Sequence, residues 1–423
     1  MAPWKARGVG MGLLTGACVA LLDGMTILNA APAFADDTTD YTALIMGHAF
    51  LPTPDEPYMQ EVIDTYIDPS PAYFSGQPTY NIVGSPVSVT TPETDYGSGN
   101  TEGVSDLDTA INQELDAGNN DIVVFGYSMS NSIATQEMIN LANAGAPDAD
   151  GLKFVLAEDL NNPDGGIFTR FPGISDPSLP ATPADTPYTT DIYTIEYSGA
   201  SDFPQYDGNL LADLNAADGY TDLHPYLLTG WPAYFTPSEL AGAVAENTSA
   251  ADNTDYFIIP TQDLPVLDGL RDGPGAPSAF ADMIQPDMRV LVDLGYNWTG
   301  DADIVTPAGG APDIDTTAVD AYLAAGADQG MIASLVDLGI LPQADLSNLS
   351  NLYPYVPDVA NLESGSLTSD AMATADATTS LAALESDLAD STNPLATDLS
   401  AYLPGAASDL ADFFQNSLSF LSL

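Results

Sequence analysis

Short apolar segments alternate with helical patterns through the first half of the chain, and this alternation constrains the fold more than any other feature. Leu107, Ile111 and Leu115 share one face of a helix predicted over residues 105–117, which Gly118 ends. Strands that alternate with helices form a parallel sheet with helices on both faces. Because only about five or six strand signals precede residue 230, we predict an open α/β sandwich rather than a barrel. The clearest predicted strands are residues 43–46, 80–83, 121–125, 153–157 and 191–197.

The charge balance of the chain excludes several classes of protein. Its 423 residues include 60 Asp and Glu but 6 Lys and Arg, which gives a formal net charge of −54. So few cations cannot neutralise nucleic-acid phosphates, and they argue against binding to an anionic membrane surface. Hydrophobic residues make up 45% of the chain, too many for a wholly disordered protein. We therefore expect a soluble acidic protein that buries a sizeable core.

Residues 1–35 are predicted to be a secretory signal peptide. Lys5 and Arg7 form a short basic region before a long apolar run, and residues 33–35, Ala-Phe-Ala, have the small-x-small form of a cleavage site. A transmembrane anchor is the competing interpretation, but Asp23 interrupts the apolar run before it is long enough to span a bilayer. We therefore expect a protein that is secreted, extracellular or in the cell envelope.

Cleavage of this segment would remove Cys18, which is the only cysteine in the chain. A lipid anchor on Cys18 is an alternative, although the residues before it form a poor lipobox. The mature chain is then expected to have no disulfide, thiol nucleophile or cysteine metal ligand. Two histidines without cysteine also argue against a structural zinc site. We predict neither a metal nor a cofactor.

A domain boundary is predicted near residues 307–312, where Pro, Gly and Ala cluster. The predicted organisation is thus a main α/β domain over residues 36–305 and an acidic extension over residues 306–423, which is largely helical or disordered. Two interpretations of the extension stay open: its apolar stripes pack on the parent domain or on each other, or they dock on a partner or the cell envelope. The stripes consist of Leu381, Leu384 and Leu388 in one case and of Leu410, Phe413, Phe414 and Leu418 in the other.

The segment 126–130, Gly-Tyr-Ser-Met-Ser, lies between a predicted strand and a predicted helix. This G-x-S-x-S pattern in a strand–turn–helix context is typical of a nucleophile elbow, whose tight turn requires small flanking residues and exposes the hydroxyl above the sheet. Ser128 is therefore the candidate nucleophile. The backbone amide of Met129, at the start of the helix, is a candidate donor to an oxyanion.

The chain offers only two histidines as a general base, His48 and His224. An α/β-hydrolase places its nucleophile before the acid and the histidine, so His224, which follows Ser128, is the candidate base. His48 ends the first predicted strand, where such folds place the loop that supplies a second oxyanion amide. We expect this amide to come from His48 or Ala49, and two roles for the His48 side chain stay open, pocket lining or none.

The acid of the triad is expected between Ser128 and His224. Asp202 lies just past the strand predicted over residues 191–197, where a carboxylate can reach the imidazole. Asp202 is the preferred candidate and Asp207 is the next. The other aspartates in the last third of this stretch are Asp191, Asp213, Asp218 and Asp222.

Several segments together resemble the PE-PPE-domain serine hydrolases of mycobacteria and their relatives. Residues 47–54 resemble the family's Gly-Gly-Thr-x-x-Pro-Thr-Pro loop, and residues 126–130 match its G-x-S-x-S elbow. Further similar segments are residues 161–166, 170–172, 202–204, 209–215, 259–267 and 294–296. The resemblance covers roughly residues 42–300 and implies an α/β-hydrolase fold with Ser-Asp-His esterase chemistry, carried onto Ser128, Asp202 and His224.

The chain departs from the family pattern at three positions. His48 and Ala49 stand where Gly and Thr are usual, and Ser198 stands where many members have Asp. We interpret the loss of that rival acid as favouring Asp202. No PE or PPE helical module is recognisable before the hydrolase segment.

We therefore predict a secreted serine esterase that acts on acyl esters or lipids through an acyl-enzyme intermediate. The alternative is an acyltransferase that moves acyl chains onto a cell-envelope sugar or glycolipid, because the same triad serves both reactions and only the acceptor differs. A second alternative is a non-catalytic cell-surface module built on a hydrolase fold.

Overall fold

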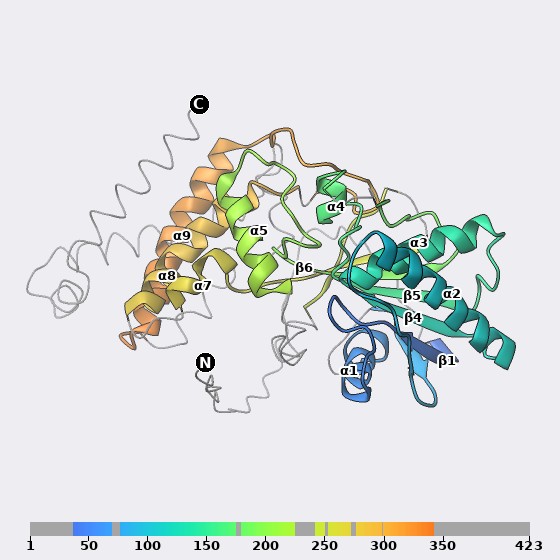
Figure 1. Ribbon diagram of the computed structural model, residues 1–423. Coiled ribbons are helices and arrows are strands. Elements are labelled where there is room, and N and C mark those ends of the chain that lie inside the picture. The colour runs from blue at the N-terminus through green and yellow to red at the C-terminus, as the bar shows by residue number, and fades with distance from the viewer. Residues whose placement is uncertain are drawn as a thin grey trace, which may run out of the picture. The chain divides into compact units, whose positions relative to one another are not determined.

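The computed structural model describes residues 37–69, 77–174, 179–224, 242–249, 253–271, 276–297 and 299–341 (Figure 1). Within these residues, eight strands form one sheet in the order β2-β1-β4-β5-β6-β8-β7, and β3 pairs with β1. Only the pair β7–β8 is antiparallel. The predicted α/β fold with a mostly parallel sheet is thus confirmed. The strands are β1 Asp37–Ile45, β2 Tyr80–Ile82, β3 Val87–Ser88, β4 Ile122–Tyr127, β5 Leu152–Ala157, β6 Thr189–Ile195, β7 Val244–Ala245 and β8 Thr254–Ile259.

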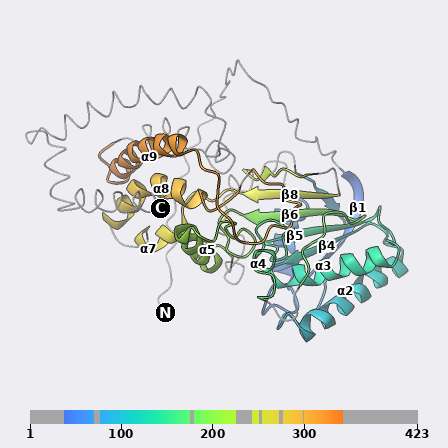
Figure 2. The same cartoon turned by 90° about the horizontal axis from the view of Figure 1, so that it is seen from above.

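Helices cover both faces of this sheet. Successive side chains of each strand point to opposite faces, and apolar side chains are buried on both of them. On one face, Phe125 of β4 and Tyr193 of β6 pack with Tyr66, which follows helix α1 (Glu56–Val62) in the π-helix η1 (Ile63–Ile67). On the other face, Val124 and Phe154 pack against helices α2 (Ser98–Ala117) and α3 (Met129–Asn143), which run side by side in Figure 2. Burial on both faces explains why β4 is apolar along its whole length.

Helix α2 begins seven residues before the predicted start and ends at the predicted Gly118, whose φ of +93° suits glycine. The early start depends on the Asp95 carboxylate, which accepts hydrogen bonds from the amides of Gly97 and Gly99. The first turns lie close to α3, because a Cβ at Gly103 would lie 2.3 Å from Cδ1 of Ile133. Tertiary packing therefore overrides the low helix propensity of a glycine-rich segment.

A second group of helices lies beyond the carboxyl ends of the strands. It consists of α4 (Ile167–Arg170), α5 (Leu210–Asp222), the 3₁₀ turn η3 (Pro265–Leu267), α7 (Asp268–Arg271), α8 (Ala276–Asp293) and α9 (Thr316–Asp337). Arg289 of α8 joins this group to the end of β6, because it donates to the carboxylate of Glu196 at 3.1 Å and to the hydroxyl of Tyr197 at 3.1 Å.

Helix α9 belongs to the predicted extension, and it packs against α8 through Val319, which contacts a cluster with Val290 and Leu294. This part of the extension thus packs on the parent domain. The two leucine-rich stripes and the predicted signal peptide lie outside the described residues. Among the helices that are described, none combines the length and apolar character that a membrane span requires.

Candidate active site

The turn between β4 and α3 has the geometry of a nucleophile elbow. Ser128 has a φ of +55°, a strained backbone conformation for a residue that is not glycine. Gly126 is required, because a Cβ there would lie 2.6 Å from Oδ1 of Asn131. Ser130 is small enough for the turn, and it also binds the backbone of Tyr127. Its hydroxyl accepts a hydrogen bond from the Tyr127 amide at 2.8 Å and donates one to the Tyr127 carbonyl at 3.0 Å. These contacts stabilise the turn that presents Ser128.

The Ser128 hydroxyl lies 2.8 Å from Nε2 of His224, although the two residues are 96 positions apart in the chain. Both side chains are buried. The imidazole of His224 is stacked between the rings of Tyr127 and Tyr220, with centroid distances of 5.5 and 5.4 Å. The Tyr127 hydroxyl also donates to the His224 carbonyl at 2.5 Å. The predicted meeting of serine and histidine therefore occurs, and the aromatic rings hold the imidazole plane.

The carboxylate that contacts His224 is Glu158, which is not among the acids predicted from the sequence. Its Oε2 lies 3.0 Å from Nδ1 of His224. Glu158 follows β5 directly and has a φ of +55°, which turns its side chain back toward the elbow. Since β5 is the neighbour of β4 in the sheet, the end of β5 lies closer to Ser128 than the end of β6 does.

The prediction that Asp202 contacts the imidazole is wrong in this structure. The carboxylate of Asp202 instead accepts a hydrogen bond from the Tyr197 amide at 2.7 Å, and the Asp202 amide donates to the Ser198 carbonyl at 2.8 Å. These two hydrogen bonds form a turn over residues 197–202, directly after β6. The Asp202 carboxylate therefore binds the backbone of this turn and not His224. Asp207, the second choice, is exposed on the surface. Glu158 directly follows the strand predicted at residues 153–157, and this position could have indicated it as the acid.

Glu158 is fully buried, and four donors surround its carboxylate. Besides His224, the Ile195 amide donates to Oε1 at 2.7 Å, the Ser201 hydroxyl donates to Oε1 at 2.7 Å, and the Ser198 hydroxyl donates to Oε2. A buried charge requires such compensation, because removal from water costs several kcal/mol. Ser198, which stands where many family members have Asp, therefore donates a hydrogen bond to the acid Glu158.

The loop predicted to complete the oxyanion hole lies beside the elbow. The His48 ring packs edge-on against Tyr127 at 6.2 Å. Burial lowers the pKa of His48, and its Nδ1–H donates to the Ala49 carbonyl at 2.7 Å. The loop is tight, since a Cβ at Gly47 would lie 1.9 Å from the Leu51 carbonyl oxygen. The His48 ring thus lines the site, while the amides of Met129 and of His48 or Ala49 stay the predicted oxyanion donors.

A mostly parallel sheet that carries a serine at a strand–helix elbow, a histidine beside it and a carboxylate behind the histidine is typical of α/β-hydrolases. Residues 77–297 match the PE-PPE domain, and the chain belongs to this family.

Three curated relatives, all from Mycobacterium tuberculosis, extend the comparison. The "PE family protein PE3" is 44% identical over 60% of this chain and 54% of its own length, and the "Esterase PE16" is 40% identical over 74% and 60%. The "SL1278 acyltransferase Chp1" is 35% identical over 50% of this chain and 51% of its own length. The chain thus spans between half and three fifths of the length of each of these relatives.

Proposed function

We propose that this chain is a secreted serine esterase that hydrolyses acyl esters with Ser128 as nucleophile, His224 as general base and Glu158 as the acid. The observation that carries the proposal is the continuous hydrogen-bonded path from the Ser128 hydroxyl through both nitrogens of His224 to Glu158, with distances of 2.8 and 3.0 Å. The similarity to a relative called an esterase supports the same reaction class.

The proposed reaction begins with His224 in the tautomer that carries its proton on Nδ1, because this nitrogen faces Glu158. Nε2 takes the proton of Ser128 while the seryl oxygen attacks the ester carbonyl, and the oxyanion accepts hydrogen bonds from the amides of Met129 and of His48 or Ala49. The imidazolium then donates its proton to the departing alcohol. Water attacks the acyl-enzyme by the reverse proton path, which releases the acid and restores Ser128.

Glu158 holds the imidazole in that tautomer and stabilises the imidazolium that forms during each step. Its own position depends on Ser198 and Ser201, whose hydroxyls donate to its two oxygens. Asp202 does not contact Glu158 in the proposal and acts on it indirectly. Its hydrogen bond from the Tyr197 amide closes the turn that carries Ser198 and Ser201. Ser198, Ser201 and Asp202 are therefore positioning residues.

Ser128→Ala tests the nucleophile, and Ser132→Ala is its matched control. Ser132 is a buried serine one helical turn further along α3, and its hydroxyl donates to Oδ1 of Asn161 rather than to His224. We expect Ser128→Ala to abolish hydrolysis of p-nitrophenyl butyrate and labelling by a fluorophosphonate, while Ser132→Ala keeps both. Full labelling of Ser128→Ala would place the nucleophile elsewhere, and no labelling of the wild type would favour a non-catalytic module.

Acyl transfer to an alcohol is the second candidate function, and the similarity to Chp1, which is called an acyltransferase, favours it. The two reactions share the acyl-enzyme and differ in whether water or a hydroxyl group attacks it. Incubation with a long-chain p-nitrophenyl ester and trehalose, followed by mass spectrometry, separates them. Free fatty acid as the sole product supports hydrolysis, and acylated trehalose supports transfer to a cell-envelope sugar or glycolipid.

Secretion is part of the proposal and rests on the sequence of the first 35 residues. The test is expression of the full chain in an actinobacterial host, followed by N-terminal sequencing of the protein in the culture medium. A mature protein that begins at Asp36 is expected. Retention of the uncleaved chain inside the cell would contradict it.

A further inference from the structure

The chain has very few cationic side chains, and two of them are buried at the turn over residues 197–202. Of the 6 Lys and Arg, two lie in the predicted signal peptide, and the described residues carry Lys153, Arg170, Arg271 and Arg289. Arg170 is 3% exposed and Arg289 is 5% exposed. A buried guanidinium group is costly unless its donors are satisfied, and both of these groups find acceptors in the turn or in the residues directly beside it.

Arg289 holds the start of the turn. It extends from α8 and donates to the Glu196 carboxylate at 3.1 Å and to the Tyr197 hydroxyl at 3.1 Å, and its guanidinium carbon lies 5.2 Å from the centroid of the Tyr197 ring. The same group donates to the carbonyls of Thr261 and Gln262, the second at 2.9 Å. Since these two residues follow β8, Arg289 joins the ends of the neighbouring strands β6 and β8 where the turn begins.

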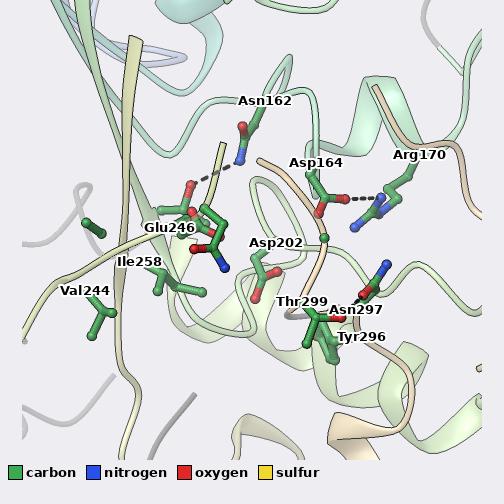
Figure 3. A pocket seen from close by; sticks show the side chains of 14 residues that line it. Asn162, Asp164, Arg170, Asp202, Val244, Glu246, Ile258, Tyr296, Asn297 and Thr299 are labelled. Carbon is green, nitrogen blue, oxygen red and sulfur yellow. Dashed lines mark hydrogen bonds and ion pairs between the residues drawn. The ribbon is translucent and has the colours of Figure 1, made fainter. Parts of the chain in front are cut away.

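Arg170 holds the end of the turn. It lies in α4 and donates to the carbonyl of Phe203, one residue past the turn, at 2.8 Å. Its ion pair with Asp164 at 2.6 Å and its hydrogen bond to the Thr306 carbonyl at 2.6 Å fix the guanidinium group. Figure 3 shows this ion pair and Asp202, the last residue of the turn, in the wall of one cavity.

The turn between these two contacts binds the proposed acid. The hydroxyls of Ser198 and Ser201 both donate to the Glu158 carboxylate, the second at 2.7 Å. Tyr197 has a φ of +67°, a strained backbone conformation that persists only where the surrounding structure holds it. The two arginines supply contacts of this kind on both sides of the serines.

We propose that Arg170 and Arg289 are positioning residues that keep Glu158 in line with His224, an inference that rests on the proposed function of the site. Both act through the turn and not on the substrate. Loss of either set of contacts lets the turn move, so that its two seryl hydroxyls no longer fix the carboxylate opposite Nδ1 of the imidazole. The nucleophile then loses part of its activation, while the substrate contacts are unchanged.

Arg289→Lys and Arg170→Lys test the proposal. Each variant keeps the positive charge, but an ammonium group cannot reach all the acceptors that the planar guanidinium group binds. We expect kcat for p-nitrophenyl butyrate to fall roughly tenfold or more, with little change in KM. Arg271→Lys is the matched control and should keep the wild-type kcat, because Arg271 pairs with Asp282 of α8 and with Asp263 but has no hydrogen bond or ion pair with the turn.

Tyr197→Phe is a milder second variant, which serves if the lysine variants fail to fold. It removes the hydroxyl that accepts from Arg289 and donates to Asp293 of α8 at 2.5 Å, and it leaves the pair of Arg289 with Glu196 in place. We expect kcat to fall roughly three- to tenfold, again with little change in KM.

Proton NMR supplies a readout that a loss of stability alone would not move. The Nδ1–H of His224, which faces Glu158, should give a low-field resonance that Glu158→Gln removes, and this signal does not require turnover. We expect the resonance to move upfield or to disappear in Arg289→Lys and Arg170→Lys and to stay in place in Arg271→Lys.

The outcomes separate this proposal from the proposed function. Wild-type kcat with an unmoved resonance in a folded arginine variant would overturn the assignment of that arginine. An equal loss in Arg271→Lys, or a raised KM at unchanged kcat, would overturn the proposal as a whole. A wild type that neither hydrolyses esters nor reacts with a fluorophosphonate would instead refute the proposed function, and the resonance would then decide by itself whether the arginines hold the acid.

Discussion

Replacement of Glu158 by glutamine tests the part of the site that the sequence did not anticipate. Four donors surround the carboxylate, namely the Ile195 amide, two seryl hydroxyls and Nδ1 of His224. Glutamine has a single acceptor oxygen, so its NH₂ group must face at least one of these donors. The imidazole can relieve that clash by moving its proton from Nδ1 to Nε2.

In that tautomer Nε2 carries the proton and cannot accept the one on Ser128. The comparable change in a serine protease lowers kcat by about 10⁴. We therefore expect Glu158→Gln to lower kcat/KM for p-nitrophenyl butyrate by about 10³ to 10⁴, which corresponds to about 4 to 5 kcal/mol of transition-state stabilisation.

Asp202→Asn is the comparison that separates the two candidate acids. The asparagine carbonyl can still accept from the Tyr197 amide, so the turn after β6 is kept and kcat/KM should fall by less than about tenfold. Glu137→Gln controls for the loss of a buried carboxyl elsewhere and should keep wild-type activity. A loss in Asp202→Asn that equals or exceeds the loss in Glu158→Gln would refute this assignment of the acid.

Three further predictions concern the supports of the site and the stability of the sheet. Ser201→Ala removes one donor to Glu158 and should lower kcat by roughly tenfold with little change in KM, as measured by steady-state kinetics. Gly126→Ala should lower the free energy of unfolding in urea by about 1 to 3 kcal/mol and impair activity, because its Cβ has no space; Gly118→Ala, where only the positive φ is strained, should cost about 1 kcal/mol and leave activity intact. Burial raises the pKa of Asp191 to about 8, so the native state holds a proton that the unfolded state loses above pH 4, and the unfolding free energy should fall as pH rises from about 4 to about 8. Asp191→Asn should flatten that slope in pH-dependent urea unfolding, and an unchanged slope would contradict the assignment.

Local patterns were sufficient for the elements of the sheet that lie near the elbow. Residues 121–125 and 153–157 were predicted as strands and correspond to β4 and β5, because continuous apolar runs bounded by turn residues suit a strand buried on both faces. The short β3 and β7, which pair only at the edges, carry two residues each and leave no periodic signal. The start of α2 was missed because a side chain outside the helix caps it.

The amino-acid sequence by itself determined the candidate nucleophile and its candidate base, since the elbow has small residues two positions before and two positions after Ser128 and only one histidine follows it. Which carboxylate completes the path was decided by the tertiary structure. Strand order makes β5 the neighbour of β4, and a positive φ at Glu158 turns its side chain toward His224. Asp202, which chain position favoured, is held by its own turn. Proximity across a sheet depends on strand order, and local sequence does not encode that order.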